Sequence, residues 1–156
     1  MIDIATVASA AAMLNNTVSA VDKIYDWYRA RTGQPKATLE LRNNPEKEVL
    51  QYEGTSTESP RVVATYQELS GRLHEDDMVH IRSLEKRMAV AMKKWETLNE
   101  GLPLADPVER ARIELNMDHI KEQDICSSLG QITDLIQKLG IDLEDHYQTV
   151  KGMCKS

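Results

Sequence analysis

Apolar residues near the start of the chain recur at alternating spacings of three and four. This pattern predicts a helix over residues 3–31, because it gathers the apolar side chains on one helix face. Gly33 and Pro35 supply its end. We expect this face to pack on another helix, in a second subunit or in the same chain. Its seam positions are Ile4, Val7, Ala11, Leu14, Val18, Val21, Tyr25 and Tyr28.

Residues 32–59 break the helical spacing. The segment 36–53 contains short alternations of apolar and polar residues on both sides of Asn43–Asn44–Pro45, which is a turn signal. We therefore predict a small β-hairpin or an ordered loop inserted after the first helix. The insertion has no obvious place in a helical core, so we interpret it as a specificity element.

A second long helix is predicted over residues 60–100. Ser59 and Pro60 are typical of a helix start, and Gly101 is typical of a helix end. The apolar positions between them form one arc when they are placed at helical spacing. Asp77 falls inside that arc. Either the helix is continuous and buries this acid, or it breaks within residues 71–77.

The third predicted helix covers residues 106–150. Asp106 can cap it, with Glu109 completing a capping box, and Gly140 is an alternative end. A single apolar stripe begins at residue 125, whereas the first half carries two separate stripes. The apolar face therefore rotates near residues 121–124, so we expect that the first half touches two partners or that the helix bends there. Its two stripes are Val108, Ala111 and Leu115, and Ile113, Met117 and Ile120.

Composition agrees with a helical fold. Aromatic residues make up only 4% of the chain and phenylalanine is absent, which disfavours an all-β core. The predicted fold class is all-α, a single domain over residues 1–156. We expect an up-down-up bundle of three long helices, or four if the last one ends at Gly140.

Net charge limits the expected partners. At −6, the chain is a poor binder of nucleic acid and of anionic membranes, so we expect neither. Arg82, Lys86 and Lys93 lie opposite the apolar arc, where solvated charges belong.

The two cysteines and the first residues bear on location. Cys126 and Cys154 have no metal-site spacing, and a single pair is no disulfide framework in a chain of this size. No Lys or Arg precedes Lys23, so a signal peptide is not expected. These features predict a cytoplasmic protein.

Asp77 and His80 share a helix face, three residues apart. An acid and a histidine at this spacing form one element of carboxylate metal sites, but such sites need more ligands than the chain aligns. We therefore expect no metal and no cofactor. The preferred interpretation is a structural polar pair, in which His80 is the partner that a buried Asp77 carboxylate requires.

Arg112 and His119 are seven residues apart and share a face of the third helix. An arginine followed by a histidine on a late helix of a small all-α domain resembles the HEPN ribonucleases. The resemblance covers these two positions and the fold class. It implies a metal-independent ribonuclease in which both residues meet RNA phosphate across a dimer cleft. Ile113 departs from the pattern, since that family often has a polar residue there.

Three functions follow, in order of preference. The first is a non-catalytic helical bundle that acts through protein–protein interaction, with a second copy or another protein as partner. The second is the HEPN-like ribonuclease. The third is a membrane-active bundle that uses the apolar N-terminal helix.

Overall fold

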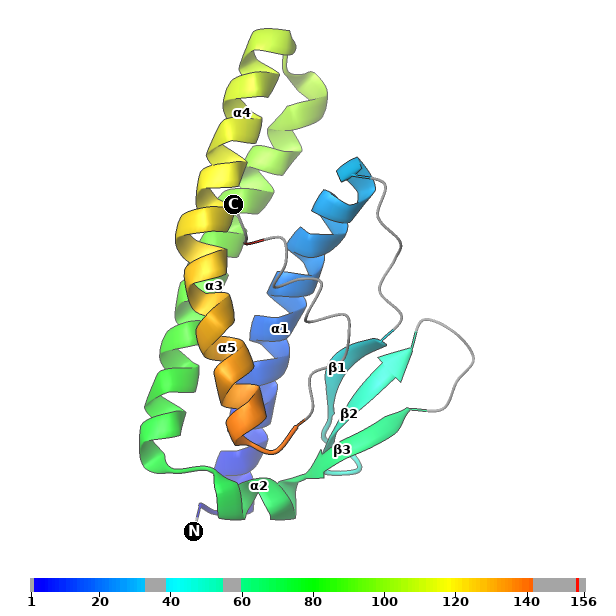
Figure 1. Ribbon diagram of the computed structural model, residues 1–156, viewed down its shortest axis with the longest axis vertical. Helices are drawn as coiled ribbons and strands as arrows, with labels where there is room; N and C mark the ends of the chain where they lie inside the picture. Colours follow the sequence, from blue (N-terminus) through cyan, green and yellow to red (C-terminus); the bar gives the residue numbers. More distant parts are fainter. Residues whose placement is uncertain (1, 33–38, 55–59, 142–153, 155–156) are drawn as a thin grey trace.

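The computed structural model describes residues 2–32, 39–54, 60–141 and 154 of the 156-residue chain (Figure 1). Within them the fold is mostly helical with a small sheet, so it is α+β rather than all-α as predicted. The elements in chain order are α1 (Ile4–Thr32), β1 (Leu39–Asn44), β2 (Val49–Gly54), β3 (Arg61–Thr65), α2 (Tyr66–Arg72), α3 (Glu75–Gly101), the 3-10 turn η1 (Leu102–Leu104), α4 (Pro107–Ile120), the π-helical turn η2 (Lys121–Ile125) and α5 (Cys126–Lys138).

The helices run up, up and down, which corrects the predicted up-down-up order (Figure 1). Asn16 of α1 bonds Glu85 of α3, and Lys23 bonds Glu96 further along both helices. Later residues of α1 pair with later residues of α3, so the two helices are parallel. The intervening sheet returns the chain to the end at which α1 began. The rings of Trp27 and Trp95 meet edge to face, 5.6 Å apart, near the Lys23–Glu96 contact of the same two helices.

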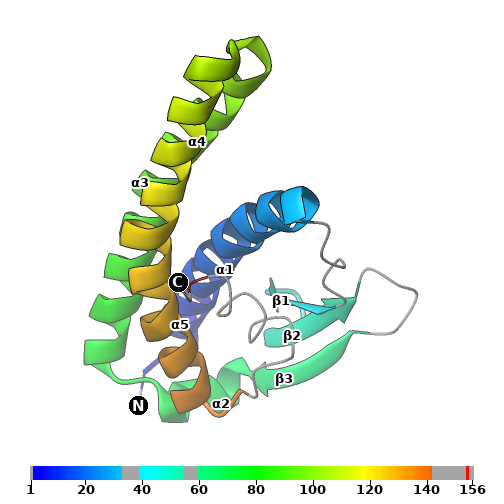
Figure 2. The same cartoon turned by 45° about the horizontal axis from the view of Figure 1, so that its top comes forward.

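α3 and α4 form a hairpin whose tip projects beyond the other elements (Figure 2). The first of them, α3, buries a row of apolar residues against the rest of the chain, with Trp95 only 2% exposed. α4 and α5 return along it, joined through η2. The projecting part therefore has fewer elements around it than the base of the molecule has.

The sheet is antiparallel with strand order β1-β2-β3. The predicted hairpin is confirmed, because β1 pairs with β2 in register from Leu39 opposite Gly54. The predicted helix start at Ser59–Pro60 is wrong, since residues 61–65 add a third strand. Their β-branched side chains suit a strand, and pairing with β2 satisfies backbone groups that a hairpin edge would leave open.

The sheet is also part of the core, contrary to its interpretation as a separate specificity element. Leu41, Leu50 and Tyr52 are at most 2% exposed and belong to the same apolar cluster as α1. The next residue of β1, Arg42, bonds the buried carboxylate of Asp22 in α1, at 3.1 Å. Both packing and charge therefore hold the sheet against α1.

The predicted continuous helix over residues 60–100 is broken, as the alternative allowed. Thr65 caps α2 through a capping box with Glu68, and α2 ends at Arg72. Leu73 and His74 are extended, and α3 begins at Glu75. Asp77 therefore lies in the first turn of a helix rather than in the middle of one.

The boundaries of the last helical segment agree better with the sequence. Asp106 caps α4 by accepting a hydrogen bond from the Glu109 amide, as predicted. The predicted rotation of the apolar face coincides with η2, where an additional residue per turn shifts the register. α5 ends at Lys138, two residues before Gly140. Residues 142–150, the predicted continuation, lie outside the described residues.

Replacing either of two glycines with alanine is expected to change the stability of the fold, in opposite directions. Gly140 has φ of +78°, and an added Cβ would lie 2.8 Å from Arg72 Nη1, which donates to the Leu139 carbonyl. We expect Gly140→Ala to destabilise the fold by about 1–2 kcal/mol. Gly130 lies inside α5 with open space around it, so Gly130→Ala should stabilise by about 0.5–1 kcal/mol. Urea denaturation measures both, and equal signs would contradict the assignment of the left-handed turn.

Candidate protein-interaction surfaces

The predicted seam of α1 is covered within the chain. Val7, Ala11, Leu14, Val18 and Val21 are all at most 2% exposed. They pack in the common core, where α1 contacts α2, α3 and β1. These five side chains are therefore not available to a partner. Ile4 is 38% exposed at the start of the helix, and the side chains of Tyr25 and Tyr28 lie outside the described part.

Asp77 has different partners from the predicted one. Its Oδ2 accepts from the backbone amide of His74 at 2.9 Å, and its Oδ1 accepts from Lys138 Nζ at 2.6 Å. His80 is half-buried and is not among these partners, so the predicted Asp77–His80 pair is corrected. The carboxylate caps α3 and joins it to α5.

Burial raises the pKa of Asp77, but the hydrogen bonds from Lys138 and from the His74 amide, with the charges of both residues, outweigh it and leave the pKa lowered. A lowered carboxyl pKa indicates that the charged form is stabilised in the fold. Asp77 is thus a structural group. In the described ranges no cluster of three His, Cys, Asp or Glu side chains is placed to hold a metal.

Arg112 and His119 are both exposed on α4. His119 borders a groove between α3 and α4, but Arg112 is not among the residues that line it. Within the described residues of one chain, Arg112 and His119 therefore do not line the same cleft. The ribonuclease interpretation would need a second subunit to supply that cleft.

The two predicted stripes of α4 separate in the structure. The inner stripe packs toward α3, with Met117 fully buried and Ile113 and Ile120 partly buried. On the outer stripe, Val108 is 72% exposed and Leu115 58% exposed. The sequence predicts a partner for each stripe, and the described chain provides one for the inner stripe only.

The groove between α3 and α4 encloses about 680 Å³, and it continues along α3 into a hollow of about 390 Å³. Val90 and Lys94 line both parts. Leu98 and Ile120 extend the apolar floor, and Val90 is 55% exposed within it. This α3–α4 groove has cationic residues along the α3 side, namely Lys86, Arg87, Lys93 and Lys94.

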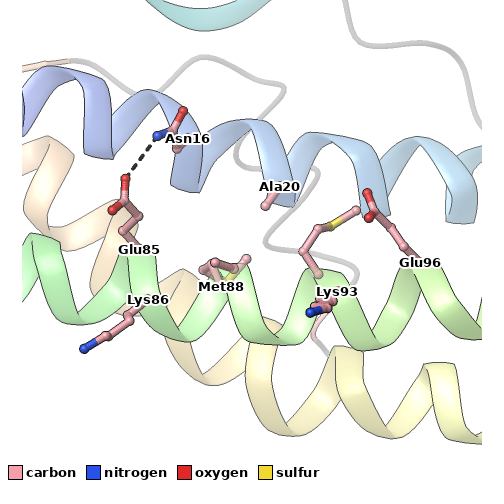
Figure 3. A pocket seen from close by; sticks show the side chains of 9 residues that line it. Asn16, Ala20, Glu85, Lys86, Met88, Lys93 and Glu96 are labelled. Carbon is pink, nitrogen blue, oxygen red and sulfur yellow. Dashed lines mark hydrogen bonds between the residues drawn. The ribbon is translucent and has the colours of Figure 1, made fainter.

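A second hollow, of about 490 Å³, lies between α1 and α3 (Figure 3). Met88 and Ala20 contribute apolar surface, and the Asn16–Glu85 hydrogen bond crosses one end. Glu96 is paired with Lys23. The polar groups here hold α1 on α3, and none forms a nucleophile–base pair.

The cysteines form a disulfide between Cys126 and Cys154, with Cα atoms 5.5 Å apart. The sequence pattern does not predict this bond, since a single cysteine pair is no disulfide framework in a chain of this size. Cys154 packs against the core from the C-terminal end of the chain. The cysteine argument for a reducing compartment is lost, since disulfides persist mainly in oxidising ones. The cytoplasmic location stays a prediction without that support.

The hypothesis of a membrane-active bundle concerns α1. Residues Ile4–Ile24 are long and apolar enough to cross a membrane by length and composition, with mean hydropathy of 1.3. Much of the same apolar surface packs in the core, and 44% of that window is buried. A buried core helix passes the same test, so the helix carries no membrane argument.

Comparison with known proteins identified no relatives. The chain matches no protein-family model, no curated protein and no solved structure.

Proposed function

We propose that this chain is a non-catalytic interaction module that associates with a second copy through the outer stripe of α4, defined by Val108, Ala111 and Leu115. The observation that carries the proposal is the exposure of this stripe. Among the residues of α4, only Met117 is buried, while Val108 and Leu115 leave most of their surface in water. Covering large apolar side chains is favourable by about 25 cal/mol per Å².

Charge at the edges of the stripe favours a second copy as the partner. At helical spacing Arg112 and His119 flank one edge, and Asp118 flanks the other. Two copies of α4 in parallel would bring the arginine edge of each against the acidic edge of the other, as in paired coiled-coil edges. A two-fold axis makes both contacts at once.

Leu115→Glu is the direct test. We expect the wild type to be a dimer at micromolar concentration in sedimentation equilibrium. The variant should associate at least about thirtyfold more weakly, because it places a charge at the centre of the apolar stripe. Leu115 is exposed in the single chain, so the fold itself should tolerate the change.

Val62→Glu is the matched control, since Val62 is 50% exposed on β3, away from α4. It adds the same charge and should leave the mass in solution unchanged. A monomeric wild type would reject self-association. Equal weakening by both substitutions would reject the outer stripe as the interface.

The HEPN-like ribonuclease is the alternative. Arg112 and His119 lie at one edge of the proposed interface, so a dimer would place each pair beside the α4 helix of the second copy. The assay is RNA cleavage by the wild type and by Arg112→Ala/His119→Ala. Cleavage that the double variant loses would favour the ribonuclease, and an inactive wild type would exclude it.

A further inference from the structure

We propose that the α3–α4 groove binds an acidic amphipathic helix from a partner protein. This inference deepens the proposed interaction role and rests on it, but it uses a different surface from the outer stripe of α4. The juxtaposition that carries it is an open apolar floor beside a row of cations that make no ion pair within the described residues.

The cations are the unusual feature, because the whole chain is acidic with a net charge of −6. Lys86, Arg87, Lys93 and Lys94 are all exposed. Within the part of the chain that the structure describes, none of the four makes an ion pair. Glu85 directly precedes Lys86 in sequence, but it accepts a hydrogen bond from Asn16 of α1 instead.

The floor of the groove carries apolar side chains in both of its parts. Val90 lies between the two pairs of cations and lines both parts of the groove, and Leu98 and Ile120 continue it toward the hairpin tip. From Ser83 to Leu98 the groove follows α3 for about 22 Å, at 1.5 Å per residue. That length accommodates a helix of about four turns.

The opposite wall limits the ligand chemistry further. Asn116 and His119 of α4 face the larger part of the groove, and Asp124 of η2 lies at the smaller part. Asp124 is the acidic residue that lines these two hollows, so the field is positive mainly along α3. A bound helix would therefore direct its carboxylates toward α3 and its apolar side chains to the floor.

Helix-in-groove binding uses apolar side chains at positions i, i+3 or i+4, and i+7. Charges on the rim set the choice of partner and the association rate. The groove lining contains no Phe, Tyr or Trp side chain on which a nucleic-acid base could stack. A flat membrane would meet the rims but not the concave floor. These features favour a peptide helix over RNA or a lipid surface.

The experiment uses the full oxidised chain and a labelled, end-capped peptide of about 14 residues. The peptide has leucine at the i, i+3 and i+7 positions and glutamate at most others. Fluorescence anisotropy should show saturable binding that weakens as salt is added. We expect Lys86→Glu/Lys94→Glu to weaken binding at least about tenfold, because charge attraction becomes repulsion. Restored binding to a peptide with lysine in place of glutamate would show that the groove charges act directly.

Two controls separate the groove from other effects. Lys47→Glu changes a cation in the turn between β1 and β2, and it should leave peptide affinity unchanged. Leu115→Glu should also keep peptide affinity, so binding by this variant tests the groove independently of self-association. If the wild type is monomeric but binds the peptide, the self-association proposal is rejected and the groove proposal stands.

Several results would overturn the proposal. No saturable binding up to about 1 mM peptide is one. Equal affinity of the wild type and of Lys86→Glu/Lys94→Glu is another. Tighter binding to a single-stranded RNA oligonucleotide, or to phosphatidylserine vesicles, would assign the cations to a different class of partner. Circular dichroism of each variant excludes loss of fold as the reason for weaker binding.

Discussion

Removing the disulfide should lower the free energy of unfolding by about 3–4 kcal/mol. The bond joins Cys126, at the start of α5, to Cys154 across a sequence separation of 28 residues. A cross-link over a loop of this length restricts the unfolded chain, and the loop-entropy relation gives this magnitude. It is a large share of the 5–15 kcal/mol typical of a domain.

Urea denaturation of the wild type with and without reductant measures the effect. The variant Cys126→Ser/Cys154→Ser should match the reduced wild type and should not respond to reductant. Mass spectrometry of the alkylated protein establishes the state of the cysteines in each sample. A wild type with both thiols alkylated before reduction would show that the disulfide does not form.

Asp77→Asn should cost about 2 kcal/mol at pH 7. The buried carboxylate accepts from the His74 amide and from Lys138, and hydrogen bonds to a charged group contribute more than neutral ones. Asparagine keeps the size of the side chain but removes its charge. The asparagine amide group would also point a donor at either the His74 amide or Lys138, both of which are themselves donors.

The effect of Asp77→Asn should depend on pH. The pKa of Asp77 is lowered in the folded chain, so the unfolded chain binds the proton more readily. The stabilisation is therefore complete above the unfolded pKa of about 4, and it is lost as pH falls through the lowered folded value. The stability difference between wild type and variant should shrink in acid.

Asp76→Asn is the matched control, because Asp76 is an exposed acid in the same first turn of α3. It changes the interaction with the helix dipole by a similar amount, about 0.3–1 kcal/mol. A loss of stability as large as that of Asp77→Asn would assign the effect to the dipole. Lys138→Met should reproduce only part of the Asp77→Asn cost, since the His74 hydrogen bond stays.

The location of Asp77 shows where sequence patterns mislead. Its apolar neighbours keep one helical phase across residues 71–77, so the periodicity does not reveal the break. The break is marked instead by the Leu73–His74 pair, which adopts extended backbone angles. Lys138, the true partner, is 61 residues away in sequence, whereas His80 is one turn away. A local pattern favours near partners, but only the packing of α5 on α3 brings the lysine close.

The sequence alone determined that the chain is mostly helical, and it located the first long helix, the cap at Asp106, the turn that follows Asn44 and the rotation of the apolar face near residues 121–124. Each depends on neighbours in the chain, through helical spacing, capping or turn chemistry. Tertiary structure decided the rest. The third strand needed the edge of β2, the α1 seam became core because α3 and the sheet cover it, and Cys126 met Cys154 through the return of the chain. These outcomes depend on contacts between distant segments, whose free energy no local pattern contains.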